Sequence, residues 1–142
     1  MTIALVTLIL VTQAFPTAGT SPSTPPLKRD YDCTDYQYQD NTSSGSPLVS
    51  DCQQLVSNIF GPGSWRTDQL SFRTIASYDA CNFGVQQATP EIVIFVVGNQ
   101  DVEFIINNCI NAYQSGGRVG TSGNTQCNSD IKANNDVYWS LY

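Results

Sequence analysis

Five cysteines, at positions 33, 52, 81, 109 and 127, constrain the fold of this 142-residue chain more than any other feature of its sequence. No two of them have the C-x-x-C spacing of zinc knuckles and thioredoxin-type motifs, so the spacing favours disulfide bonds over a metal site. Because the number is odd, at least one thiol stays outside intramolecular disulfides. Two disulfides and one free thiol allow fifteen arrangements of the five cysteines, and counting alone does not choose among them.

The N-terminal region has the pattern of a secretory leader. Residues 3–11 form an apolar run that is typical of a signal peptide and too short to span a bilayer. We expect cleavage after Ala14, with Ala18 as the alternative. Residues 15–29 then form a flexible pro-segment rich in proline, serine and threonine. It ends in the dibasic pair Lys28-Arg29, which is the kind of site that furin- and kexin-type secretory proteases cut.

The remaining segment, residues 30–142, is predicted to be one extracellular domain that is acidic and lacks histidine. The chain has 6 basic and 12 acidic residues and a formal charge of −6, which becomes −8 without Lys28 and Arg29. An acidic chain has little attraction for nucleic acid or an anionic membrane surface, so we expect neither partner and no membrane insertion. The absence of histidine excludes Ser-His-Asp and Cys-His catalysis.

Two segments have the apolar periodicity of amphipathic helices. The first begins at Ser46, an N-cap candidate, with Pro47 suited to the first turn, and it ends at Gly61-Pro62. The second has Asn99 as its N-cap candidate, acidic residues in its first turn and Gly116-Gly117 at its end.

Strand patterns surround these helices. The expected strands are residues 79–87 and 92–97, joined as a hairpin through residues 88–91, a first strand around residues 36–38, and residues 118–127 and 136–142. In the last segment, Val137, Trp139 and Leu141 are expected to face the core. This order predicts an α+β fold, an antiparallel sheet with both helices packed on one face.

The helix and strand pattern favours two disulfides, Cys52–Cys81 and Cys33–Cys127. Cys52 lies on the apolar face of the first helix and Cys81 on a core-facing strand position, whereas Cys33 and Cys127 lie near the two ends of the domain. Cys109 has no assigned partner, and it faces the core from the second helix as a buried thiol.

Five segments together resemble a known family. They are Ser46–Cys52, Tyr78–Val85, Val97–Asp101, Gly117–Gly120 and Val137–Tyr142. In order and spacing, over roughly residues 31–142, they resemble the fungal secreted effector domain named for extracellular protein two, the necrosis-inducing factor family. Two positions depart from that family, Asp79, where glycine is more usual, and Cys109, where a small residue other than cysteine is expected.

The resemblance implies a disulfide-bridged, killer-toxin-like α/β sandwich that an ascomycete fungus exports, with links to virulence and host cell death. It brings no catalytic residue, and some members are fused to chitin-binding or chitinase modules. We therefore expect an effector that binds a host target without catalysis, cofactor or metal. The alternatives are a killer-toxin-like antimicrobial protein that acts on competing microbes and a binder of cell-wall glycan.

Few individual residues carry a chemical signal. Asn41 begins the N-glycosylation sequon Asn41-Thr42-Ser43, and Trp65, beside a glycine-rich turn, is the candidate partner-contact residue. Asp101 and Glu103 do not share a helix face, so capping of the first turn is the better interpretation than acid–base catalysis. The acids at positions 32, 35 and 40 lack the spacing of a calcium-binding EF-hand loop.

Overall fold

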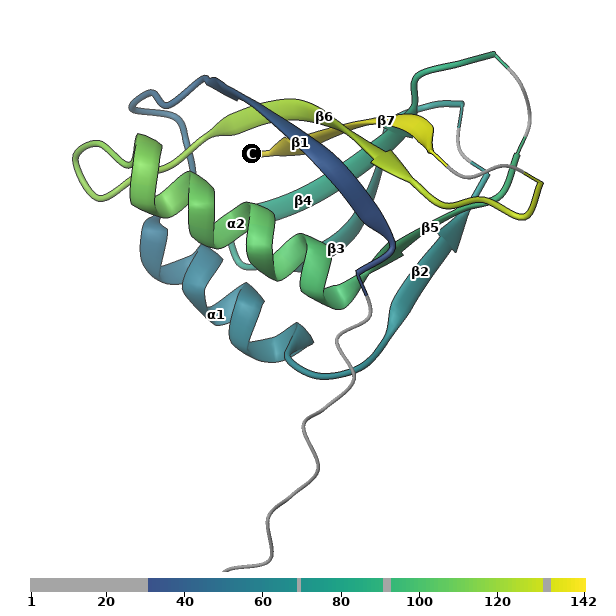
Figure 1. The fold of residues 1–142 in the computed structure, drawn as a ribbon. Coiled ribbons are helices and arrows are strands. Elements are labelled where there is room, and N and C mark those ends of the chain that lie inside the picture. Colours follow the sequence, from purple (N-terminus) through teal and green to yellow (C-terminus); the bar gives the residue numbers. More distant parts are fainter. Residues whose placement is uncertain (1–30, 69, 91–92, 132–133) are drawn as a thin grey trace, which may run out of the picture.

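The computed structural model describes residues 31–68, 70–90, 93–131 and 134–142, which contain two helices and seven strands (Figure 1). In chain order they are β1 (Cys33–Asp40), α1 (Val49–Ile59), β2 (Ser64–Thr67), β3 (Arg73–Tyr78), β4 (Cys81–Gln87), β5 (Phe95–Gly98), α2 (Asn99–Tyr113), β6 (Thr121–Cys127) and β7 (Asn135–Leu141). Five strands form an antiparallel sheet in the order β1-β6-β7-β4-β3. β2 and β5 pair as a separate two-stranded sheet.

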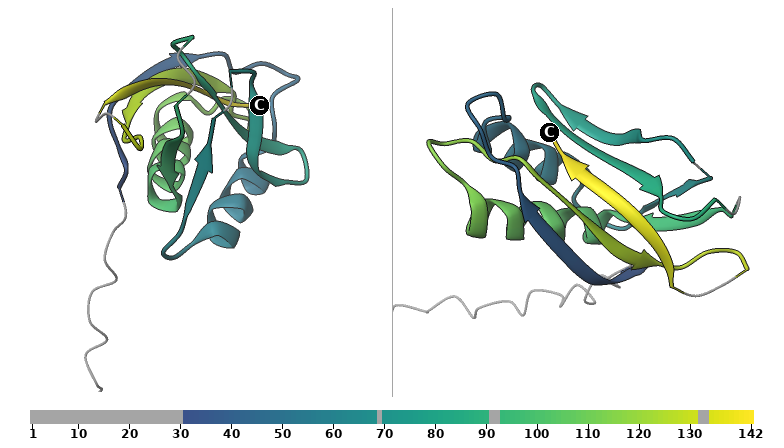
Figure 2. Two further views of the ribbon diagram at one scale, coloured as in Figure 1. Left: turned by 90° about the vertical axis from the view of Figure 1, so that its right-hand side faces the viewer. Right: turned by 90° about the horizontal axis from the view of Figure 1, so that it is seen from above.

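Both helices lie on the same face of the five-stranded sheet (Figure 2). α1 contacts β3 and β4, α2 contacts β1 and β5, and the two helices contact each other. The core between the helices and the sheet is formed by buried apolar side chains from every layer, including Leu55, Phe83, Val85, Ile105, Ile106 and Trp139. The predicted fold class, an α+β domain with two helices on one face of an antiparallel sheet, is confirmed.

β7 is the central strand of the large sheet, because it pairs with β6 on one side and with β4 on the other. Its side chains alternate as predicted. Val137, Trp139 and Leu141 are at most 1% exposed, whereas Tyr138 is 51% exposed and Tyr142, which follows the strand, is 43% exposed. The segment therefore contributes both to the core and to the outer face of the sheet.

The predicted hairpin between residues 79–87 and 92–97 is wrong. β4 is paired on both sides, with β3 and β7, and β5 pairs with β2 instead. The sequence analysis missed β2 and β3 because neither has a clear alternation of buried and exposed residues. In β3 only Ala76 is buried. A strand of this kind is held by its neighbours in the sheet rather than by its own apolar face.

Asp79 and Ala80 connect β3 to β4, because Tyr78 is the register partner of Cys81. Asp79 has φ 47°, in the left-handed region that glycine adopts without steric cost and that aspartate tolerates better than most residues. This backbone angle gives a physical reason for the glycine that the family resemblance leads us to expect at this position.

The two helix starts differ from their predicted caps. α1 begins at Val49, because the Ser46 hydroxyl accepts a hydrogen bond from the Ser43 amide at 2.9 Å and so closes the preceding loop instead. At the start of α2 the N-cap is Gly98 rather than Asn99. The Asn99 side chain instead donates to the Ile59 carbonyl at 2.9 Å, at the end of α1.

Candidate functional site

The face of the five-stranded sheet opposite the helices, which we call the open face, has no covering element among the described residues (Figure 2). Strand alternation and register place uncharged side chains at its outward positions: Gln37 and Gln39 of β1, Ser122 and Asn124 of β6, Tyr138 and Ser140 of β7, Asn82 and Gln86 of β4, and Thr74 of β3. The acid Asp136 lies at the start of β7. The centre of the open face is thus polar, aromatic and neutral.

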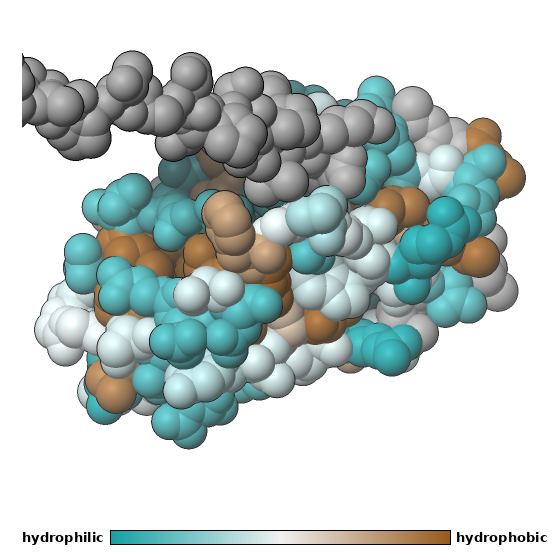
Figure 3. Space-filling view, turned by 90° about the horizontal axis from the view of Figure 1, so that it is seen from below, coloured by the Kyte–Doolittle hydropathy of each residue, from teal (hydrophilic) through white to brown (hydrophobic). Residues whose placement is uncertain are grey.

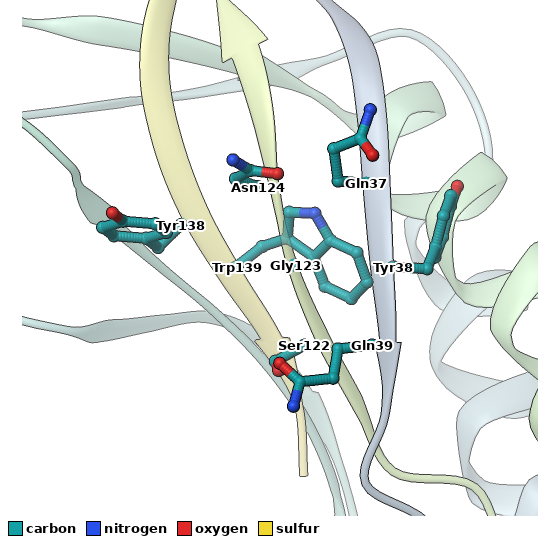
Figure 4. Close-up of a pocket in the computed structure, with 8 residues that line it drawn as sticks. All are labelled: Gln37, Tyr38, Gln39, Ser122, Gly123, Asn124, Tyr138 and Trp139. Carbon is teal, nitrogen blue, oxygen red and sulfur yellow. The ribbon is translucent and has the colours of Figure 1, made fainter.

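A hollow of about 470 Å³, the first hollow, crosses β1, β6 and β7 on the open face (Figure 4). Side chains around it include Gln37, Gln39, Ser122, Asn124, Tyr138 and Trp139. Amide and hydroxyl groups offer both donors and acceptors, and the Tyr138 ring offers an exposed apolar plane. This combination suits a neutral ligand with many hydroxyl or amide groups.

Gly123 brings the backbone of β6 onto the Trp139 indole at the floor of the first hollow. A Cβ at position 123 would overlap the Gln37 carbonyl oxygen and would lie 2.5 Å from Trp139 Cζ2. Because any side chain there would displace the strand or the ring, only glycine fits this position. The glycine therefore keeps the indole under the first hollow.

The indole nitrogen of Trp139 is buried and has no hydrogen-bond partner among the described residues. Leaving a buried donor unpaired costs about 1–3 kcal/mol. In Figure 4 the nitrogen lies on the side of the ring toward Gln37 and Asn124. Trp139 belongs to the core-facing side of β7 and is 1% exposed, so this donor lies beneath the first hollow.

A second hollow, of about 390 Å³, lies at the other end of β7. Its lining includes Asn41, Gly120, Ser140 and Tyr142. The Tyr142 hydroxyl is 2.6 Å from the Thr74 hydroxyl, which holds the tyrosine side chain on the open face. The second hollow thus also combines an amide, hydroxyls and an exposed ring.

A buried carboxylate fixes the edge strand beside the first hollow. Asp101, in the first turn of α2, is fully buried and accepts hydrogen bonds from the backbone amides of Gly98 (2.8 Å), Asp32 (2.9 Å) and Cys33 (3.4 Å) and from the Tyr36 hydroxyl (2.6 Å). Burial raises the pKa of Asp101, and the four hydrogen bonds oppose that shift. Asp101 ties β1 to α2 and caps the helix, which agrees with its predicted role.

Two disulfides connect these layers. Cys33–Cys127 joins β1 to β6 at a register pair, and Cys52–Cys81 joins α1 to β4. They are the two pairs that the helix and strand pattern favoured. Cys109 is a buried thiol that accepts a hydrogen bond from the Thr121 hydroxyl at 2.8 Å, and burial raises its pKa to about 11.

The other predicted site residues have different environments. Asn41 is exposed and lies at the second hollow. Trp65 lies in β2, in the smaller sheet, where it is half-buried against the core instead of standing out as an exposed anchor. Lys28-Arg29 and the predicted signal peptide lie outside the described residues.

The open face itself was missed by the sequence analysis. Its signal was present in the amides and hydroxyls that alternate with buried or half-buried residues in β1 and β6, such as Gln37, Gln39, Ser122 and Asn124. Within a single strand, such residues indicate only which side of the strand faces solvent. Whether they form a common surface depends on which strands are neighbours in the sheet.

The helix side of the molecule has a different surface. Figure 3 shows it from below, with apolar surface between hydrophilic groups. Phe60 at the end of α1 is 69% exposed, and Phe104 of α2 is 40% exposed. In the part of the chain that the structure describes, no three His, Cys, Asp or Glu side chains are grouped as metal ligands. No helix among the described residues has the length and apolar character needed to cross a membrane.

A family model described as "Pathogen effector; putative necrosis-inducing factor" matches residues 32–127 of this chain. This match confirms the resemblance seen in the sequence. It spans β1 to β6 and therefore includes both disulfides and most of the open face.

Two curated proteins of Penicillium expansum are similar to this chain. It is 40% identical over 119 residues to one named "Probable chitinase LysM18", an alignment that covers 82% of this chain and 8% of that protein. It is 32% identical over 108 residues to one named "Secreted chitinase LysM12", with 74% of this chain and 7% of that protein covered. The chain thus spans less than a tenth of the length of either relative.

These names correct one expectation and agree with another. Both relatives are named as enzymes, which contradicts the prediction that a chain of this kind is not an enzyme, and that prediction is withdrawn. One relative is named as a secreted protein, in agreement with the extracellular localisation predicted for this chain.

Proposed function

Because this chain belongs to the pathogen-effector family described as a putative necrosis-inducing factor, we propose that it is a secreted effector that binds a neutral glycan of the chitin class through its open face. The observation that carries this proposal is the first hollow. Its lining is rich in amides and hydroxyls, and the exposed ring of Tyr138 lies at its side. None of the described residues that line it is charged.

The chemistry of N-acetylglucosamine fits this lining. Its ring hydroxyls and acetamido group exchange hydrogen bonds with glutamine and asparagine amides such as Gln37 and Asn124, which are both donors and acceptors. The apolar side of a sugar ring packs on an aromatic plane, which Tyr138 offers.

The names of the two relatives support the same class of glycan. A chitinase acts on chitin, the polymer of N-acetylglucosamine, and this chain resembles a short part of two proteins with that name. The proposal concerns glycan binding by this domain. Release of soluble sugar from chitin is measured in the same assay, because the relatives are named as enzymes.

The test is retention of the purified domain on insoluble chitin, with Tyr138→Ala as the variant. Tyr138 is half exposed, so its removal should leave the fold intact, and we expect at least tenfold weaker retention, which corresponds to about 1.4 kcal/mol. Tyr78→Ala is the matched control, because Tyr78 is 42% exposed but lies at the end of β3, outside the first hollow. Equal retention of Tyr138→Ala and the wild type would reject the open face as the site.

Salt dependence provides a second test. A neutral site should retain N-acetylated chitin equally at low and high ionic strength, because no charged pair is screened. Deacetylated chitosan is a polyamine, and its attraction to this acidic protein should disappear at high salt. If chitin retention falls in parallel with chitosan retention, binding is an effect of net charge and the proposal fails.

Infiltration of the protein into leaf tissue tests the link to the effector role. If glycan binding serves that role, Tyr138→Ala should give a weaker response than the wild type. An equal response to both would instead indicate a host target bound elsewhere on the molecule.

A further inference from the structure

The two hollows of the open face are neighbours along β6 and β7. Ser122 lines the first hollow and Ser140 lines the second, and these two residues are register partners in β6 and β7. Backbones of paired strands lie about 5 Å apart, so the two hollows approach each other at this pair. Tyr138 and Tyr142 are both exposed, and Tyr138 lines the first hollow whereas Tyr142 lines the second. A linear ligand longer than the first hollow would therefore enter the second.

Asn41 lies at the junction of the hollows. It lines the second hollow, and its side-chain amide is hydrogen-bonded to the Ser122 hydroxyl of the first at 2.7 Å. The loop that carries it is held in place, because the Asn41 backbone amide donates to the Gly120 carbonyl at 2.8 Å. The Thr42 hydroxyl accepts from the Gly120 amide at 3.1 Å, so the position of Asn41 is set from both sides.

Asn41 is also the acceptor residue of the sequon Asn41-Thr42-Ser43 in a secreted protein, and its side chain is exposed. The first sugars of an N-linked glycan are N-acetylglucosamine units, the same units that form chitin. A glycan on Asn41 would therefore present the proposed ligand to the second hollow from a covalent attachment.

We propose that the second hollow is a second subsite of the glycan site and that an N-linked glycan on Asn41 occupies it. This inference rests on the proposed function. A tethered ligand has an effective concentration in the millimolar range, which exceeds the concentration of most free oligosaccharides. The glycosylated protein then binds only what fits the first hollow, and the unmodified protein binds longer chains across both.

The experiment compares the full chain secreted by a glycosylating yeast host with its Ser43→Ala variant. That substitution removes the sequon and leaves the Asn41 side chain in place, with the loss of one hydroxyl from the lining of the second hollow. Both proteins also carry Trp65→Phe, which makes Trp139 the remaining one of the two tryptophans. Because Trp139 lies under the first hollow, its emission reports ligand binding there. The ligands are N-acetylglucosamine oligomers of two and six units.

We expect Ser43→Ala to bind the hexamer at least tenfold more tightly than the dimer. The glycosylated protein should bind the two oligomers with similar affinity, and its dimer affinity should match that of Ser43→Ala. An endoglycosidase that leaves one sugar on Asn41 should restore only part of the preference for the hexamer.

The outcomes separate this inference from the proposed function. If neither protein responds to either oligomer, the proposed function fails, and this inference fails with it. If both proteins bind and prefer the hexamer equally, the open face is a glycan site, but Asn41 does not control it. If mass spectrometry of the protein secreted by yeast finds no glycan on Asn41, the inference is also overturned.

Discussion

Asp101→Ala should destabilise the domain strongly, because it removes the acceptor shared by four donors. Two of them, the Gly98 and Asp32 amides, point at one carboxylate oxygen, and the Tyr36 hydroxyl and the Cys33 amide point at the other. Each donor left buried and unpaired costs about 1–3 kcal/mol, although costs within one network are not additive. We expect the free energy of unfolding to fall by about 3–5 kcal/mol, from a total of roughly 5–15 kcal/mol.

Asp101→Asn tests the same site with the shape conserved. Its amide keeps one oxygen as an acceptor but turns an NH₂ group toward two donors, so we expect a loss of about 1–3 kcal/mol.

The pH dependence of this difference in stability has a definite sign. Burial raises the pKa of Asp101 in the folded protein above its value in the unfolded chain, which is about 4. The contribution of Asp101 to the free energy of unfolding is therefore fully present below pH 4, and it is lost as the pH rises through the pKa of the folded protein. The advantage of the wild type over Asp101→Asn should therefore shrink as the pH rises from 4 to 7.

The assay is urea unfolding of the oxidised domain, followed by tryptophan fluorescence at pH 4 and pH 7. Asp136→Ala is the control, because this exposed acid at the start of β7 should change stability by less than about 0.5 kcal/mol. A loss below 1 kcal/mol in Asp101→Ala would refute the assignment of Asp101 as the residue that holds β1 on α2. A wild-type advantage that grows with pH would refute the direction of the pKa shift.

Three further predictions concern the framework. Cys109→Ser should cost only about 1–3 kcal/mol, because a serine hydroxyl can also accept from Thr121, whereas Cys52→Ser should lose a disulfide that spans 29 residues, worth about 3–4 kcal/mol. Comparable secreted yields of the two variants would contradict this. Deleting residues 137–142 should abolish secretion of folded protein, since it removes most of the central strand, and a truncated form with an unchanged thermal midpoint would disprove its structural role. N-terminal sequencing should find secreted material that begins at Asp30, and a start only at Phe15 or Gly19 would show that the dibasic pair is not cut.

The sequence alone determined the parts of this protein that depend on local pattern. The helical periodicity of two segments, the alternation around Trp139 and the extracellular compartment that the predicted leader indicates follow from residues close together in the chain. The core-facing positions of Cys52 and Cys81 were likewise readable from helix and strand periodicity, because burial of apolar faces fixes which way each residue points.

The tertiary structure alone decided which strands are neighbours. The predicted hairpin failed because β4 is paired with β3, through the tight turn at Asp79 and Ala80, and with β7, a distant partner that no local pattern near β4 specifies. Asn99 has the signature of an N-cap but instead binds the end of α1.

The open face, too, is decided by which strands are neighbours in the tertiary structure. Gln37, Asn124 and Tyr138 are far apart in the sequence and each indicates only an exposed strand position, and the pairing of β1, β6 and β7 brings them around one hollow. Hydrogen bonds between strands depend on backbone groups that every residue carries, so side chains encode register only through burial. A surface made of exposed polar residues therefore becomes visible only once the fold has placed the strands side by side.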